Sequence, residues 1–109
     1  MKLVVCIVHN RDRNRLCDQL VKSEFKFTVI GSSGGFLREG NTTLLSCVQD
    51  DKLDLLKQII EVNCRAREQV VNAVPYESAA SVAFVPSAMT VQVGGAVVFV
   101  VEVNEFVRF

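Results

Sequence analysis

The fold is decided by the run Lys-Leu-Val-Val-Cys-Ile-Val at residues 2–8. This run is rich in β-branched residues and is too short for a helix, so it predicts a strand. Neighbouring side chains of a strand point to opposite faces of a sheet, and both sets of positions are apolar here. The sheet that contains this strand therefore needs cover on both of its faces.

An amphipathic helix is predicted directly after this strand. From Asn10 to Ser23, apolar residues recur in an i, i+1, i+4, i+5 stripe with charged residues between them, and Asn10 can serve as the N-cap. Residues 25–30 return to strand composition, glycines and serines at 31–35 interrupt it, and residues 42–48 resume it. These two runs predict a long hairpin with a glycine-rich tip.

The second half of the chain is predicted to hold a helix, a loop and a strand. Asp50 or Asp51 caps a helix that runs to Cys64 or several residues beyond, because apolar residues recur on one of its faces. Residues 74–89 contain both prolines and show no period, which predicts a long loop. The closing strand covers residues 90–93 and 96–103, and the glycines between these runs favour a hairpin or a bulge.

The order βαββαβ predicts the α+β class, as a ferredoxin-like four-stranded antiparallel sheet with two helices on one face. At 109 residues one domain is the rule, so we expect a single domain over residues 1–109. The runs 44–48 and 96–101 are also apolar at positions of both faces. We therefore expect another copy of the chain to cover the face that the helices leave open.

Charge and hydropathy narrow the classes of partner. The 12 Lys and Arg residues balance the 12 Asp and Glu residues, so no overall field would hold nucleic acid or an anionic membrane. The apolar run at the N-terminus is too short for a signal peptide, and the longest apolar stretch falls far short of the roughly 20 residues of a membrane helix. We therefore expect a cytoplasmic protein that binds neither nucleic acid nor a membrane. Any anionic ligand must be bound by a few residues of a local site.

The sequence shows no convincing constellation for catalysis or for metal binding. Its 4 cysteines form no C-x-x-C spacing and its 1 histidine is His9, so we expect free thiols, no metal site and no cofactor. An enzyme of the acylphosphatase type would need an Arg and an Asn around a phosphate, and Arg13 or Arg15 with Asn41 could be offered. No phosphate-cradling loop is visible between the first strand and the first helix, so an enzyme is not expected.

The segment from Phe25 to Thr43 carries the most information about function. Its consecutive glycines let backbone N–H groups approach a phosphate, Phe36 offers a face for a base, and Asn41 offers a donor and an acceptor. Lys26 and Thr28, two residues apart on a strand, point to the same face. An ordinary glycine hairpin with an exposed Phe would explain this composition equally well.

Several motifs occur together along the chain. They are the opening Met-Lys-Leu-Val-Val-Cys-Ile-Val, Asp12-x-Asn14-Arg15-Leu16, Thr28, Gly34-Gly35-Phe36-Leu37, Gly40-Asn41-Thr42-Thr43, Arg67-x-Gln69, Val93-Gly94-Gly95-Ala96-x-Val98-Phe99-Val100 and Asn104-Glu105-Phe106. With this combination the chain resembles, nearly from end to end, the PII-like cyclic di-AMP receptors of Gram-positive and related bacteria.

The resemblance implies a PII-like homotrimer with cyclic di-AMP bound in clefts between neighbouring subunits. It also implies a short loop after the second strand and a long loop after the second helix. The resemblance further implies that the ligand reorders both loops for a downstream protein partner that is not identified. Carried over residue by residue, the resemblance gives a ligand pocket made of Thr28, Gly35, Phe36, Leu37, Asn41 and Phe99.

Three further positions of the expected ligand-binding set depart from the family's pattern. Lys26 stands where the family usually has Arg, Cys47 where it has Gly, and Arg108 where it has Gln. Lys keeps the charge without the planar fork, Cys adds a side chain, and Arg replaces an acceptor by a cation. A diverged PII-like interaction protein that binds another nucleotide, or no ligand, is therefore the alternative to a cyclic di-AMP receptor.

Overall fold

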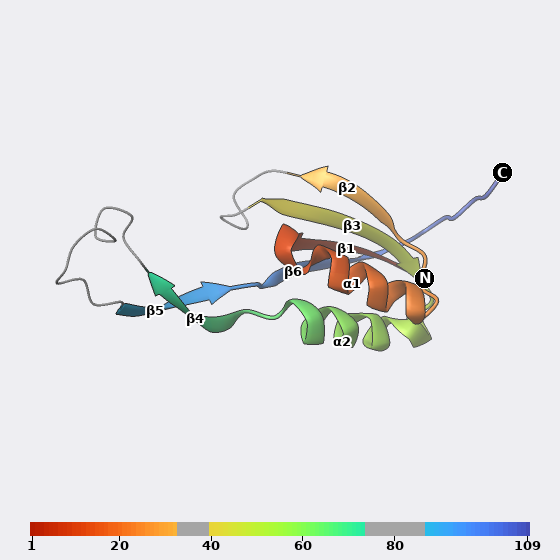
Figure 1. Ribbon diagram of the computed structural model, residues 1–109. Coiled ribbons are helices and arrows are strands. Elements are labelled where there is room, and N and C mark those ends of the chain that lie inside the picture. Colours follow the sequence, from red (N-terminus) through yellow and green to blue (C-terminus); the bar gives the residue numbers. More distant parts are fainter. Residues whose placement is uncertain (33–39, 74–86) are drawn as a thin grey trace.

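The computed structural model describes residues 1–32, 40–73 and 87–109, which form two antiparallel sheets and two α-helices (Figure 1). The larger sheet has four strands in the order β2-β3-β1-β6, which are β1 (Lys2–His9), β2 (Thr28–Ser32), β3 (Asn41–Val48) and β6 (Ala96–Glu102). Helices α1 (Asn10–Lys22) and α2 (Leu53–Cys64) lie on one face of this sheet. The predicted α+β class and four-stranded antiparallel sheet are confirmed, and the arrangement is compatible with a ferredoxin-like fold.

The core lies between the four-stranded sheet and the two helices. Alternate residues of β1 (Val4, Cys6 and Val8) are buried and face the helices. They pack against the apolar stripes of α1 and α2, in which Leu16 and Leu56 are almost fully buried. Strand β1 occupies the centre because it pairs with β3 along one edge and with β6 along the other.

The other face of the sheet carries apolar side chains that the helices do not cover, and we call it the open face. The pairing register sets Val5 of β1 opposite Leu45 of β3 and Phe99 of β6, so these three side chains share that face. Phe99 remains 43% exposed and Val101, two residues further along β6, 49% exposed. The open face is thus as apolar as the runs at residues 2–8 and 96–101 predicted.

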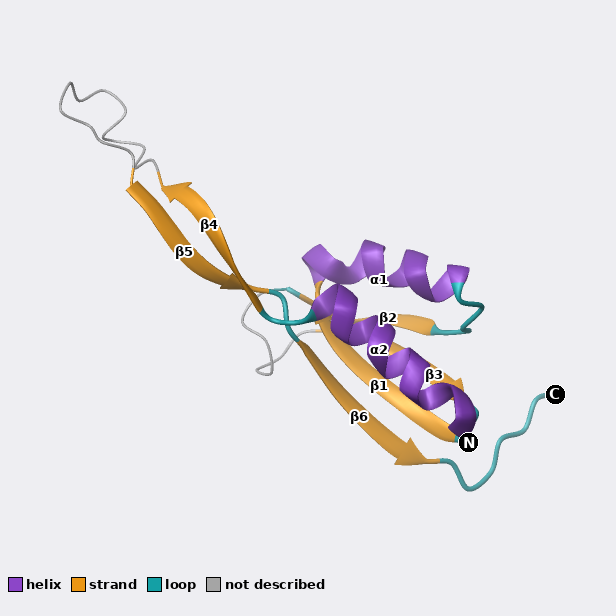
Figure 2. Ribbon diagram, turned by 90° about the horizontal axis from the view of Figure 1, so that it is seen from below, coloured by secondary structure: helices purple, strands orange, loops and turns teal. Residues whose placement is uncertain are grey.

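A second, two-stranded sheet corrects the sequence prediction. Strands β4 (Arg67–Ala73) and β5 (Ser87–Val93) pair with each other and extend away from the helices and the larger sheet (Figure 2). The helix before them ends at Cys64, the strand β4 was not predicted, and residues 87–89 are strand where a loop was predicted. Gly94 and Gly95, at φ of +77° and +108°, turn the chain from β5 into β6. The predicted closing strand is therefore split between two sheets.

The predicted helix caps and both bounds of the second strand were also wrong. His9 occupies the N-cap position of α1, while Asn10 is the first helical residue. A short 3₁₀ turn, η1 (Asp50–Lys52), precedes α2, and its Asp50 carboxylate pairs with the amino group of Met1 at 3.1 Å instead of capping the helix. Strand β2 begins at Thr28, three residues after the predicted start, and it includes Gly31 and Ser32, which were predicted to interrupt it but pair with Thr42 and Asn41 of β3.

Candidate functional site

A groove of about 430 Å³ lies at one end of the open face, and we call it the tail groove. Its walls come from β1, from β2 with the segment before it, from β3 and from the C-terminal tail. The residues that line it are Leu3, Lys26, Phe27, Thr28, Leu45, Ser46, Cys47, Phe106 and Arg108. The tail groove thus brings together four residues of the predicted ligand-binding set, namely Lys26, Thr28, Cys47 and Arg108.

Strand pairing fixes the positions of these side chains. Thr28 pairs with Leu45, and Leu3 of β1 pairs with Cys47 two residues further along β3. Lys26 precedes β2, but its carbonyl oxygen accepts a hydrogen bond of 2.7 Å from the Ser46 hydroxyl, which holds this segment against β3. The floor of the tail groove is therefore set by the register of three strands.

The tail groove combines positive charge with an apolar floor. Lys26 and Arg108 supply two exposed cations, and no Asp or Glu is among the described residues that line the groove. Thr28 adds an exposed hydroxyl, while Leu3, Leu45 and Phe106 supply apolar surface. Such a surface can hold a phosphate with its cations and pack the rest of an organic ligand against its apolar part.

Two predicted residues lie on the same face of the sheet but outside the tail groove. Asn41 begins β3, six residues from Cys47, and a strand of that length places the two about 20 Å apart. Phe99 lies on β6, three strands from Thr28 in the same cross-strand row, which is about 14 Å. Gly35, Phe36 and Leu37 lie outside the described residues. One chain therefore does not gather the whole predicted set into one pocket.

The sequence alone did not point to several residues of the tail groove. Leu45 could have been found, because it shares the two-residue alternation of Cys47 on β3. Leu3, Phe106 and Ser46 reach the groove only through strand register or the path of the tail. No spacing along the chain would have revealed those contacts.

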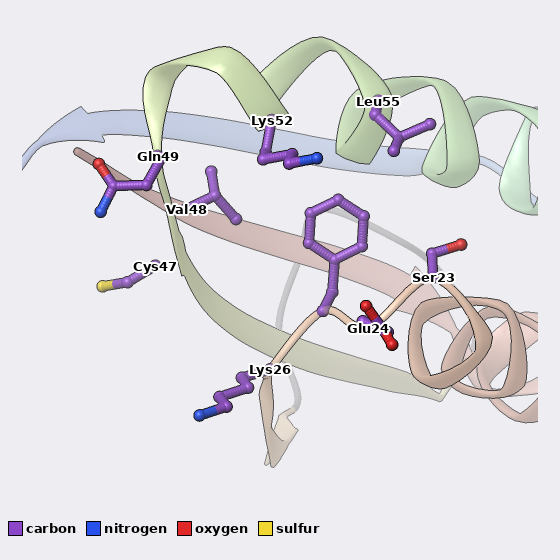
Figure 3. Close-up of a pocket in the computed structure, with 9 residues that line it drawn as sticks. Ser23, Glu24, Lys26, Cys47, Val48, Gln49, Lys52 and Leu55 are labelled. Atoms are coloured by element: carbon purple, nitrogen blue, oxygen red, sulfur yellow. The ribbon is translucent and has the colours of Figure 1, made fainter.

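A second hollow, of about 300 Å³, adjoins the tail groove (Figure 3). It lies between the α1–β2 connection, the end of β3 and the start of α2, and Lys26 and Cys47 border both hollows. Its rim carries Lys52 but also Glu24, whose carboxylate opposes an anionic ligand. The tail groove, without a lining carboxylate, is the better site for an anion.

The four cysteines differ sharply in their surroundings. Cys47 is exposed in the tail groove, whereas Cys6 and Cys64 are buried in the core. Burial raises the pKa of the Cys6 thiol and of the Cys64 thiol to about 12 each, and it also raises the pKa of Cys17. In the described part of the chain, no three His, Cys, Asp or Glu side chains gather closely enough to hold a metal ion.

Within the same described residues, neither α1 nor α2 is long and apolar enough to cross a membrane.

Comparisons with known proteins cover the whole chain. A family model described as "Cyclic-di-AMP receptor" matches residues 1–109. A solved structure, the crystal structure of a functionally unknown protein from Pediococcus pentosaceus ATCC 25745, is 35% identical in sequence and superposes with a TM-score of 0.79. That match covers 99% of this chain and 96% of the other.

In the folded protein without nucleotide, iodoacetamide at pH 8 should alkylate Cys47 first. Only about one in ten thousand of the Cys6 and Cys64 thiols is ionised at that pH, given their raised pKa of about 12, and both are buried. Peptide mapping by mass spectrometry over a time course gives the order of labelling. Cys47→Ser should remove the fast phase of alkylation, and Cys17→Ser should leave that phase unchanged. Rapid labelling of Cys6 or Cys64 would contradict the structure.

Proposed function

Since this chain belongs to the Cyclic-di-AMP receptor family, we propose that residues 1–109 form one receptor domain, which binds cyclic di-AMP in clefts between the subunits of a homotrimer. It acts in signal transduction by binding rather than by catalysis, and it passes the signal to a downstream protein partner. The observation that carries this proposal is the tail groove, where Lys26, Thr28, Cys47 and Arg108 meet.

The chemistry of the tail groove suits one half of a cyclic dinucleotide. Each phosphodiester of cyclic di-AMP carries one negative charge, and Lys26 and Arg108 can bind it without competition from a carboxylate in the groove. The Thr28 hydroxyl can donate to a phosphate oxygen or to a base edge. An adenine can pack on the apolar floor, which includes the aromatic ring of Phe106.

The separation of the predicted residues supports a cleft between subunits. Asn41 lies about 20 Å from Cys47 along β3, too far for both to line one compact pocket of a single chain. In a ring of subunits each interface joins two different surfaces, so one subunit can present the tail groove and the next can present Phe99, which is 43% exposed. A homotrimer with three identical interfaces would then hold three equivalent sites.

The open face supports the same assembly. Val5, Leu45, Phe99 and Val101 form an apolar surface on the side of the sheet away from the helices. Burying such a surface stabilises an assembly by roughly 25 cal/mol for each Å² removed from water. The occupant we propose is the open face of the other two subunits.

The departures from the family pattern leave one alternative function. The exposed Cys47 side chain projects into the tail groove, where the family usually has a glycine without a side chain. This narrows the groove and would favour a diverged PII-like interaction protein that binds another nucleotide or no ligand. Direct titration separates the two functions.

Calorimetric titration should show that cyclic di-AMP binds more tightly than cyclic di-GMP or ATP, with one ligand per subunit. The selectivity follows from a site shaped for two phosphodiesters and two adenines, since guanine changes the base edge and ATP lacks the ring. Equal affinity for all three nucleotides, or no heat from any of them, would reject the receptor function in favour of the interaction protein.

Light scattering at micromolar concentration should give the mass of a trimer. Phe99→Glu puts a charge on the open face and should shift the mass towards the monomer, because a buried unpaired carboxylate costs several kcal/mol. The matched control is Val62→Glu on the outer face of α2, where Val62 is 67% exposed and the trimer should persist. A monomeric wild-type protein would refute the assembly.

Substitutions of the two cations of the tail groove, Lys26 and Arg108, should have coupled effects on the affinity for cyclic di-AMP. Lys26→Arg provides a planar guanidinium that can donate two hydrogen bonds to the phosphate, and it should make the binding of cyclic di-AMP more favourable by about 1 kcal/mol. Arg108→Gln should also change the affinity for cyclic di-AMP. Because both side chains line one groove, the double variant should differ from the sum of the single changes by more than about 0.5 kcal/mol. Lys57→Arg, on α2 and outside the tail groove, is the control. Unchanged affinity in both single variants would show that neither cation contacts the ligand.

A further inference from the structure

Helix α2 carries a second apolar stripe, which the rest of the chain covers only in part. Leu55, Ile59 and Val62 follow one another at spacings of four and three residues, so they share one flank of the helix. Leu55 is 43% exposed and Val62 is 67% exposed. By contrast, Leu56 and Ile60 pack on the sheet and are almost fully buried. The stripe is therefore apolar surface beyond what the core uses.

The flank of α2 that carries this stripe faces α1. Leu55 lines the second hollow together with Ser23, the residue that follows α1 (Figure 3). Lys57, on the opposite flank of α2, lines a different hollow beside β6. Near the other end of α2, the Arg15 guanidinium of α1 donates to the carbonyl oxygen of Asn63. The two helices thus run side by side in opposite directions (Figure 2).

The flank of α1 that faces α2 is basic. Arg15 contacts α2, and Arg11 and Lys22 lie four residues before it and seven residues after it, so all three share one side of the helix. The Arg15 side chain is 52% exposed although it pairs with Asp12, and Arg11 and Lys22 are also exposed. Asp18, an exposed carboxylate, lies at the margin of this row. The row thus has three cations beside one exposed anion.

We call the surface formed by this basic row and the apolar stripe of α2 the helix seam. The stripe spans seven residues, which is about 10 Å or two helical turns, and the same number of residues separates Arg15 from Lys22. At Leu55 the helix seam opens into the second hollow, of about 300 Å³. The helices lie on the side of the sheet away from the open face, so the trimer that we propose leaves the helix seam exposed.

We propose that the helix seam binds an acidic amphipathic helix of another protein. Apolar side chains at i, i+4 and i+7 of that helix match the spacing of the stripe on α2. Two carboxylates seven residues apart on one flank of the helix then pair with Arg15 and Lys22. This inference rests on the proposed function, since it gives the chemical class of the downstream protein partner.

Calorimetry with two synthetic helical peptides tests the docking surface on the full chain, without nucleotide. The acidic peptide carries Leu at i, i+4 and i+7, and Glu at two flanking positions seven residues apart. The basic peptide has Lys in place of each Glu. The protein should bind the acidic peptide at least about ten-fold more tightly than the basic peptide, and added salt should reduce this preference.

Two variants test the apolar and the charged parts of the helix seam separately. Val62→Glu places a carboxylate in the stripe and should weaken binding of the acidic peptide at least about ten-fold. Its control is Val21→Glu, because Val21 is similarly exposed, at 65%, and lies on a different side of α1 from Lys22. Lys22→Glu should weaken binding of the acidic peptide and strengthen binding of the basic peptide, a change that loss of structure would not produce. Lys57→Glu, on the opposite flank of α2, should keep the wild-type preference.

The docking surface is overturned if the acidic peptide does not bind at concentrations up to about 1 mM, if Val62→Glu binds it as the wild type does, or if Lys22→Glu keeps the wild-type preference. Loss of the trimer in Val62→Glu would overturn it in favour of a second copy of the chain on the helix seam. Binding to phosphatidylserine vesicles that is lost in Lys22→Glu, without peptide binding, would overturn it in favour of a membrane. Peptide binding without any binding of cyclic di-AMP would support the docking surface and reject the proposed nucleotide receptor.

Discussion

The apolar character of β1 on both of its sides is the constraint on which the rest of the structure depends. One side is satisfied within the chain, where Val4, Cys6 and Val8 pack against the two helices. The other side is not, because both helices lie on the same face of the sheet. In the trimer that we propose, neighbouring subunits cover this second side and bring together site residues that one chain holds apart. Assembly and ligand binding then have a common physical origin.

The sequence predicted those parts of the fold that local hydrophobic patterns encode. Apolar runs located β1, β3 and β6, and an apolar stripe located each helix. Strand β4 was missed because Arg67, Glu68 and Gln69 show no apolar alternation, and its stability depends on pairing with a strand some 20 residues away. The caps were wrong because a tertiary contact intervened: the Asn10 side chain bonds Thr42, from a different strand, instead of its own helix.

The candidate site was predictable only where its geometry is local. The two-residue spacing of Lys26 and Thr28 predicted that they share a face of one strand; both line the tail groove, although Lys26 lies before β2. The contact of Arg108 with this groove depends on the path of the tail, and the contact of Leu3 depends on its pairing with Cys47. Neither follows from spacing along the chain. The resemblance supplied Arg108 as an expected site residue, and the structure shows that Arg108 lines the same groove as Lys26, Thr28 and Phe106.

The described charged groups differ in burial, and this difference suits them to different tasks. Lys26 and Arg108 are exposed, so they can exchange water for a phosphate at small cost in desolvation. Asp12 is buried, and hydrogen bonds from Arg15 and Arg67 stabilise its carboxylate. These ion pairs join the first turn of α1 to the start of β4, so the charge of Asp12 has a structural role that the exposed cations of the tail groove do not have.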